Sequence, residues 1–589
     1  GFQTPRRGPE APGNRSLHLI LFLANSWPPR AGQSGTLSLA FGSNTLRELA
    51  TMKHYLVAAL SALALTACSP QTGDTSMPDT RAPINYAAEG WTVKSLPELA
   101  EALQTGEVSA EALTQAYLDR IELVDRSGPT LQAVLTLNPD ALEAARALDA
   151  KRDSGEPLGA LHGLPILLKD NIETADNMPT TAGALALKDN VTGRDSPLVA
   201  GLRAEGAIIL GKTNLSQWAN FRSNSSMSGW SALGGQVRNP HMLDRNPCGS
   251  SSGSGAAAAA SLAAGTVGTE TNGSIICPSN VNGVVGFKPT VGLVSQDFII
   301  PISSSQDTAG PMTKTVMGAA MMLNAMATGA AKTDYAATLD AAALQGKRIG
   351  VLRGAQGSSP LIKDSFEQAL SDMESAGAIL VDIDDIDMPD GFWGKSFDVL
   401  KYEFKATLNA YLASTPDTVT TPTLADLIAF NAEHADIELA LFNQDIFEQS
   451  EGMEDLESDG YKEAVAFVQS ATRENGIDRL LAEHDVIALV APSGPLAPRA
   501  DPVNGDVWPD WAGAGYAAAI AGYPHLTVPM GTVRGIPIGL SIMGGKDQDA
   551  AILSLGYAYE QRTQARAEPQ YYQTAEDLPE IAEAMRRRD

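Results

Sequence analysis

The sequence is poor in cysteine, in aromatic residues and in positive charge. Three cysteines in 589 residues are too few for a scaffold built on disulfides or for a cysteine-rich zinc site. Lys and Arg number 42 against 69 Asp and Glu, for a net charge of −27, which argues against binding to nucleic acid or to an anionic membrane surface. No apolar run reaches the roughly 20 residues that a transmembrane helix needs.

Small and apolar residues are abundant, with 44% apolar residues and 54 glycines, as suits helices packed closely on a sheet. Buried strands are predicted from apolar runs at 166–168, 207–210, 348–352, 378–381, 486–490 and 525–528. Helices are predicted from residue 95 onward and over 113–121, 256–264 and 366–376. This alternation predicts one large α/β domain over 89–575 with helices on both sheet faces. The acidic segment 385–480 is expected to be a helical elaboration that shapes a substrate pocket.

The N-terminal part is interpreted as processing sequence rather than fold. Residues 1–51 precede the first methionine and are interpreted as upstream sequence from a mis-assigned start, with a genuine extension as the alternative. Residues 52–67 are typical of a secretory signal, and their junction with Cys68 resembles the lipobox of bacterial lipoproteins, with an ordinary signal peptide and an incidental cysteine as the alternative. The resemblance implies export to the periplasm and lipidation of Cys68, with an outer-membrane anchor as the only membrane contact. Residues 68–88 are interpreted as a flexible tether and 576–589 as a charged tail.

A block of glycine and serine, CGSSSGSG at 248–255, precedes the predicted helix at 256–264. Such a block exposes backbone N–H groups and hydroxyls at the positive end of a helix. A phosphate-binding loop is disfavoured because Gly-Lys-Ser/Thr is missing. Two catalytic interpretations remain, a nucleophile elbow around Ser251 and a serine cluster that works with a distant lysine, while a flexible linker is the non-functional alternative.

Two further segments carry residues suited to acyl transfer. In GTETNGSI at 268–275, Ser274 follows an Asn-Gly turn, where consecutive N–H groups can converge as an oxyanion hole, although Asn-Gly is also a common hairpin turn. In GLPILLKDN at 163–171, Lys169 ends an apolar run. Burial would lower the pKa of this lysine and make it a neutral base, but the segment alone favours a solvated lysine at the end of a strand.

Together the three segments resemble the amidase signature family, strongly over 160–320 and more loosely over 485–565. Lys169 matches the family's base, Ser250 the bridging serine that follows a cis peptide bond, and Ser274 the nucleophile, 24 residues further on. The family's backbone oxyanion hole matches Thr271, Asn272, Gly273 and Ser274. The resemblance implies a large mixed β-sheet covered by helices on both faces. It also implies hydrolysis of an amide through an acyl-enzyme, with release of ammonia and with no metal or cofactor.

Within the family, GKTNLSQWANFR at 211–222 and PTVGLVS at 289–295 most resemble the peptide-amidase branch, whose members remove the C-terminal amide of peptides. Ile276 and Cys277 depart from the wider family but suit this branch, and Asn272 stands where Asp or Gly is usual. The implied partners are a small amide or peptide amide and water, with no nucleic acid. Aryl, aliphatic and fatty amides remain alternative substrates.

Three rival functions stay open beside this resemblance. A nucleophile elbow would pair Ser251 with one of the later histidines, His434, His484 or His525. A non-catalytic lipoprotein could bind peptides on an amidase shell. The amidotransferase subunit that acts on charged tRNA would need cytoplasmic partners, which the export signal and the acidic charge oppose.

The resemblance also brings two cysteines close together. Cys248 lies two residues before Ser250, and Cys277 lies three residues after Ser274. Because the two serines of the family's triad touch, Cys248 and Cys277 are expected to be neighbours, either joined as a disulfide or present as buried thiols.

Overall fold

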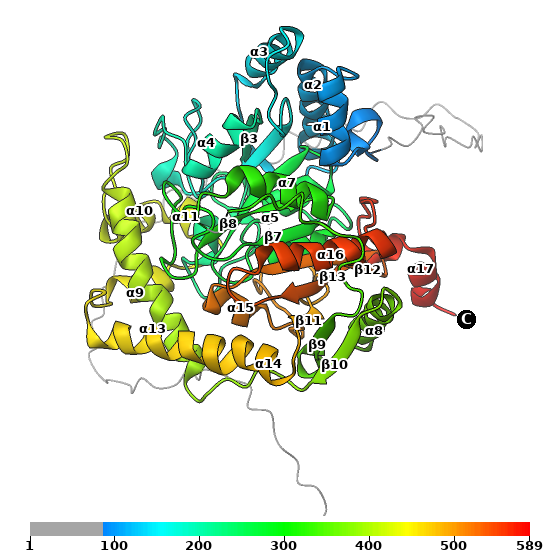
Figure 1. Cartoon of the computed structure of the whole chain (residues 1–589). Coiled ribbons are helices and arrows are strands. Elements are labelled where there is room, and N and C mark those ends of the chain that lie inside the picture. Colours follow the sequence, from blue (N-terminus) through cyan, green and yellow to red (C-terminus); the bar gives the residue numbers. More distant parts are fainter. Residues whose placement is uncertain (1–85, 331, 589) are drawn as a thin grey trace, which may run out of the picture. The chain divides into compact units, whose positions relative to one another are not determined.

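The computed structural model of the chain describes residues 86–330 and 332–588, which lie in one compact unit, Pro83–Asp589. Its centre is an eleven-stranded sheet with the strand order β1-β3-β2-β6-β8-β7-β12-β13-β11-β9-β10 (Figure 1). The predicted signal sequence and Cys68 lie outside the described residues, so export and lipidation stay predictions.

The sheet is mixed, as the family resemblance implies. Its strands are β1 (Val134–Leu137), β2 (Pro165–Lys169), β3 (Ile208–Thr213), β6 (Gly265–Glu270), β7 (Val285–Lys288), β8 (Thr308–Thr313), β9 (Arg348–Leu352), β10 (Ile379–Ile383), β11 (Ala488–Pro492), β12 (His525–Val533) and β13 (Ile536–Met543). Strand β2 pairs in parallel with β3 and β6, and β9 pairs in parallel with β10 and β11. The remaining neighbours are antiparallel.

All six predicted strands are present, with ends shifted by no more than a few residues except at β12, which continues to Val533. The strands that the sequence did not indicate include β6 and β8, whose sequences are GTVGTE and TAGPMT. Both are fully buried, and their glycine and threonine leave no apolar run to read. Because β6 lies between β2 and β8, the centre of the sheet was the part hardest to predict.

Helices cover both faces of the sheet. The helices of the core are α1 (Leu96–Thr105), α2 (Ala110–Arg120), α3 (Ala141–Asp153), α4 (Pro197–Ala204), α5 (Ser252–Ala259), α6 (Ile276–Asn282), α7 (Val316–Met326), α8 (Pro360–Ser375), α15 (Gly515–Ala521) and α16 (Asp549–Thr563). Helices α7, α8 and α16 pack on one face, and α5, α6 and α15 on the other. Successive side chains of a strand point to opposite faces of the sheet. In β12, His525 lies against Gly515 of α15 and the next residue, Leu526, lies against Gly556 of α16, so these two helices cover opposite faces.

Helix α5 corrects one prediction in detail. It begins at Ser252 and ends at Ala259, so the second half of the glycine and serine block is helical and residues 260–264 lead into β6. Small residues let this helix lie almost in contact with the backbone beneath it. A methyl group on Gly253 would lie 2.3 Å from the carbonyl oxygen of Asn214 and 2.4 Å from that of Ala133, so only glycine fits there.

The segment 385–480 is helical, as expected. It contains α9 (Phe392–Leu412), α10 (Leu424–Glu433), α11 (Ala435–Glu438), α12 (Asp445–Glu451) and α13 (Asp459–Thr472), with α14 (Asp478–Glu483) at its end. Figure 1 shows α9, α10 and α13 together at the left of the sheet. A buried ion pair joins α11 to the core, with Arg222 Nη1 3.1 Å from Glu438 Oε2 and both side chains inaccessible to solvent.

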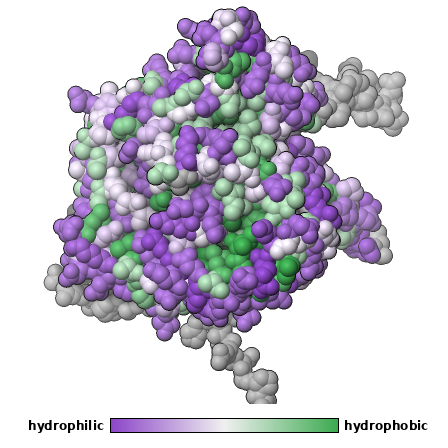
Figure 2. Space-filling model, in the orientation of Figure 1, coloured by the Kyte–Doolittle hydropathy of each residue, from purple (hydrophilic) through white to green (hydrophobic). Residues whose placement is uncertain are grey.

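Both ends of the described chain pack on the body. The ring of Tyr86, in the segment expected to be a tether, makes an edge contact with Tyr571. Helix α17 (Pro579–Met585) lies within the stretch interpreted as a charged tail, and Leu578 before it is buried in a small apolar cluster. Among the described helices, none combines the length and the apolar character needed to cross a bilayer. Hydrophilic residues cover most of the face in Figure 2.

The close approach of α5 predicts a large effect of one methyl group. We expect Gly253→Ala to lower the free energy of unfolding by about 1–3 kcal/mol, because the carbonyl oxygens of Asn214 and Ala133 must move away. Gly394→Ala is the control, since this helical glycine of α9 has no atom within 4 Å of the added carbon and should gain up to about 1 kcal/mol. Urea unfolding followed by circular dichroism measures both, and equal shifts in the two variants would contradict the packing argument.

Candidate active site

Lys169 is buried at the end of β2. Its side chain has no solvent exposure, and its Nζ lies 2.8 Å from Ser250 Oγ, 2.8 Å from Thr269 Oγ1 and 3.2 Å from the carbonyl oxygen of Thr269. The segment alone had favoured a solvated lysine. The structure corrects this, because β2 lies between β3 and β6 and not at an edge of the sheet, and the lysine at its end is fully buried.

Burial lowers the pKa of Lys169 to about 7, and the carboxylates of Asp307 and Glu270 oppose part of that shift. Removing an ammonium from water disfavours its charged form unless a close counter-ion compensates. Among the described ion pairs none includes Lys169. A substantial fraction of the side chain is therefore the neutral amine near neutral pH, which is the state that can accept a proton.

Ser250 is fixed by the backbone on either side of it. The peptide bond between Gly249 and Ser250 is cis, as the resemblance implies, and the carbonyl oxygen of Ser250 accepts a hydrogen bond from the amide of Ser216 at 3.0 Å. A methyl group on Gly249 would lie 2.1 Å from Ser216 Oγ, so glycine is required for the close approach. The Ser250 hydroxyl is thereby held against the Lys169 amine.

The loop from Thr271 to Ser274 joins β6 to α6. Gly273 adopts a left-handed conformation, with φ of +81°, which favours glycine at this turn. Within the described chain, the amide N–H groups of residues 271–274 donate to no protein acceptor, although all four residues line a cavity. The next two amides, of Ile275 and Ile276, donate to the Glu270 carboxylate. Unpaired N–H groups at a cavity wall are what an oxyanion hole requires.

The Ser274 hydroxyl lies at this cavity. The residue is 8% exposed, and its carbonyl oxygen accepts a hydrogen bond from the amide of Ser251 at 3.2 Å, which ties the segment after Ser250 to the nucleophile candidate. Within the part of the chain that the structure describes, no hydrogen bond joins the hydroxyls of Ser250 and Ser274. Catalytic hydrogen bonds of this kind often become short only when substrate binds.

Three side chains that support the site were given no role from the sequence. Thr269 holds the Lys169 amine, and Glu270 holds the first amides of α6. Asp307 accepts a hydrogen bond from Thr271 Oγ1 at 2.5 Å, and burial raises its pKa to about 6. Thr269 and Glu270 belong to the 268–275 segment, which the sequence already singles out as part of the site. Nothing in that segment, however, indicates a role for these two side chains.

The nucleophile-elbow alternative is not supported by the geometry. Ser251 Oγ donates to the carbonyl oxygen of Thr269 at 3.0 Å and accepts from its amide at 3.2 Å. His525 Nε2 lies 2.6 Å from Ser541 Oγ. No histidine of the described chain forms a hydrogen bond with Ser251, so its hydroxyl lacks the base that an elbow needs.

The cavity in front of Ser274 has a volume of about 600 Å³. Its aromatic lining consists of Phe221, Trp393, Phe397, Trp508, Trp511 and Tyr516. Trp393, Phe397 and Leu400 belong to α9, so the 385–480 segment contributes to the wall of this cavity. In the described residues, no group of three or more His, Cys, Asp or Glu side chains is arranged to hold a metal ion.

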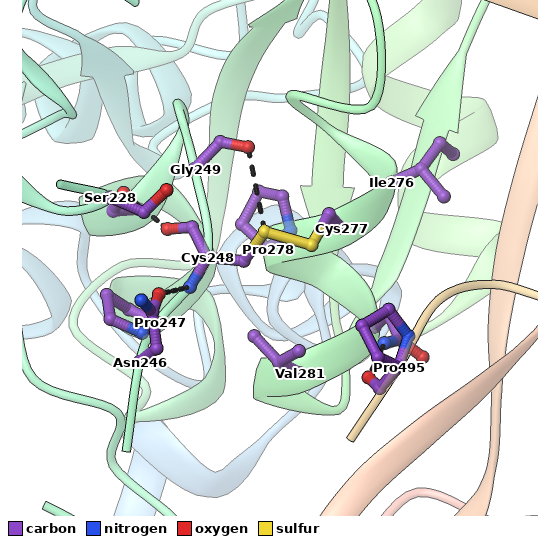
Figure 3. Close-up of a disulfide and its surroundings, with 12 residues drawn as sticks. Ser228, Asn246, Pro247, Cys248, Gly249, Ile276, Cys277, Pro278, Val281 and Pro495 are labelled. Carbon is purple, nitrogen blue, oxygen red and sulfur yellow. Dashed lines mark hydrogen bonds between the residues drawn. A yellow bond between two sulfur atoms is a disulfide. The ribbon is translucent and has the colours of Figure 1, made fainter. Parts of the chain in front are cut away.

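A disulfide joins the two halves of the site. Cys248 and Cys277 are bonded, with their Cα atoms 5.9 Å apart, so the disulfide alternative of the sequence is the one found. Figure 3 shows that the bond links the segment entering Gly249 to the start of α6. It therefore crosslinks the chain beside Ser250 to the helix that follows Ser274.

Comparison with known proteins assigns the family. The family model described as Amidase matches residues 112–553, and a "Probable amidase" of Arabidopsis thaliana is 36% identical over 503 residues, covering 81% of this chain and 91% of its own. The chain therefore belongs to the amidase family and is an amide hydrolase.

Comparison with solved structures indicates which members of the amidase family this chain resembles. The native peptide amidase of Stenotrophomonas maltophilia superposes with a TM-score of 0.76 at 45% identity, covering 81% of this chain and 98% of that one. The peptide amidase PAM in complex with the competitive inhibitor chymostatin gives a TM-score of 0.76 at 46% identity, covering 81% and 99%. Among its relatives, this chain is thus structurally similar to peptide amidases.

The disulfide predicts a redox-dependent stability. Replacing both cysteines (Cys248→Ser with Cys277→Ser) should lower the free energy of unfolding by about 3–4 kcal/mol, the loop-closure value for a loop of this length, since the sequence separation is 29. Reductant should lower the wild-type value by a similar amount and leave the double variant unchanged. Thiol titration in denaturant without reductant checks the bond directly, and two reactive thiols from these positions would refute it.

Proposed function

We propose that the protein hydrolyses a carboxamide to a carboxylate and ammonia with Ser274 as nucleophile, Ser250 as bridge and Lys169 as base. The observation that carries this proposal is the buried Lys169 amine 2.8 Å from Ser250 Oγ, beside a loop whose unpaired amides surround Ser274. The first step is attack on the amide. Lys169 accepts the proton of Ser250, Ser250 accepts the proton of Ser274, and Ser274 Oγ bonds to the carbonyl carbon.

The steps after the attack release ammonia and regenerate the enzyme. The tetrahedral oxyanion is held by the N–H groups of residues 271–274, where loss of one such donor typically costs about 10²–10³ in rate. Collapse breaks the C–N bond while Ser250 passes a proton to the leaving nitrogen, so ammonia departs and an ester on Ser274 remains. Water then loses a proton to the same relay and attacks the ester carbon. Collapse of this second intermediate breaks the bond to Ser274 Oγ, which takes the proton back from the relay, and the product leaves as a carboxylate.

We further propose that the substrate is the C-terminal amide of a peptide. The identity of 46% to the peptide amidase PAM, solved with the competitive inhibitor chymostatin, supports this choice, as does a cavity large enough for several residue-sized groups. Aryl, aliphatic and fatty amides are the competing substrates.

Lys169 is the residue whose loss should be most damaging. We expect Lys169→Ala to lower kcat by about 10³-fold or more, because no general base remains for the serines. In the wild type, kcat/KM should rise with pH around a midpoint near 7, since the amine is active when deprotonated and burial lowers its pKa to about 7. Ammonia release between pH 5 and 9 measures both effects.

Lys188→Ala is the matched control, because this lysine is exposed on the surface and its loss should leave the rate unchanged. A flat pH profile, or an active Lys169→Ala variant, would contradict the assignment of Lys169 as the general base.

The overall function is tested by a substrate panel with a covalent probe. We expect ammonia release to be fastest with peptide amides, and slower with anilides and fatty amides. A fluorophosphonate should label the wild type once, with peptide mapping placing the label on Ser274 and not on Ser251. Labelling of Ser251 would favour the elbow, whereas absence of both labelling and ammonia release would favour a binding protein.

A further inference from the structure

His525 is a buried histidine of the cavity that the proposed chemistry does not use. It is the first residue of β12, it has no solvent exposure, and it lines the cavity together with Ser493 and Gly515. The sequence offered it only as a rival base for Ser251. Because it lies in the cavity wall, His525 can contact a bound substrate without taking part in the proposed proton relay.

A chain of hydroxyls fixes the imidazole. His525 Nε2 lies 2.6 Å from Ser541 Oγ, and Ser541 Oγ donates to Ser493 Oγ at 3.1 Å. Ser493 Oγ is in turn 2.6 Å from Thr527 Oγ1. When the Ser541 hydroxyl donates to Ser493, its oxygen accepts from Nε2–H, and this tautomer leaves a lone pair on Nδ1.

Nδ1 has no hydrogen-bond partner among the described residues, although it is buried. The imidazole lies against Gly515, where an added methyl group would be 2.7 Å from Cε1 and 3.2 Å from Nδ1. Burial and the nearby Lys288 lower the pKa of His525 to about 3, so the ring stays neutral and Nδ1 stays an acceptor. A buried acceptor without a donor costs about 1–3 kcal/mol, which a donor arriving in the cavity would offset.

We propose that His525 determines substrate specificity by accepting, at Nδ1, a hydrogen bond from an N–H or O–H group in the acyl part of the substrate. The inference rests on the proposed amide hydrolysis and deepens it. The aromatic lining suits an apolar body, and the unpaired Nδ1 acceptor favours a donor beside that body. Peptide amides meet both demands through their backbone N–H groups, whereas simple fatty and aryl amides have no donor beyond the scissile carboxamide.

Matched substrates and variants test this hydrogen bond. N-acetylphenylalaninamide is compared with its ester analogue, in which oxygen replaces the backbone N–H, and tyrosinamide with phenylalaninamide. Wild type should prefer the donor-bearing member of at least one pair by about tenfold or more in kcat/KM. His525→Phe should reduce that preference to near unity, and His484→Phe, a histidine outside the cavity lining, should retain it.

Two further measurements keep the inference falsifiable. Should His525→Phe not fold, Ser541→Ala should weaken the same preference, because it removes the hydroxyl that fixes the imidazole proton on Nε2. Calorimetric binding of both pairs to Ser274→Ala gives the same ratios as Kd values without turnover. Absence of ammonia release from every amide would refute the proposed function alone. An unchanged preference in the His525 and Ser541 variants, or no binding of either pair, would overturn the role of His525.

Discussion

The contact between the Lys169 amine and the Ser250 hydroxyl governs the rest of this structure. A lysine is a useful base near neutral pH only if it is kept from water and from a close carboxylate, because either would hold the proton on it. Strand β2 meets the first demand by lying inside the sheet, and Asp307 meets the second by binding Thr271 rather than Lys169. The fold therefore lowers the pKa of this amine before any substrate arrives.

That burial depends on small residues. Gly249, Gly253 and Gly268 all lie where a methyl group would come within 3 Å of a neighbouring atom. Each allows a serine-bearing segment to approach the strand or loop behind it, and at Gly268 the neighbour is Ser251 Oγ. The glycine and alanine content noted in the sequence thus serves the site as much as the core, and the disulfide holds the two serine segments together.

The sequence predicted the parts of the fold that carry apolar runs, such as β2 and β9, and missed β6, which is buried without one. The same limit applied to the site. Nothing local distinguishes Ser250 from Ser251, and the neighbours of Lys169 alone favoured a solvated side chain. Only the family resemblance placed these residues together, because their contacts join segments about 80 to 100 residues apart.

The groups proposed to react and one part of the cavity wall come from different parts of the chain. Lys169, the two serines and the unpaired amides lie between β2 and α6, as do several lining residues of 219–228, whereas α9, residues 506–516 and the start of β12 supply another part of the wall. A change in Trp393 or His525 can therefore alter which acyl group fits without moving the Lys169 amine or the loop at Ser274. This separation gives a physical reason why one set of reacting groups can serve many amides, and why the wall is where substrate preference should be sought.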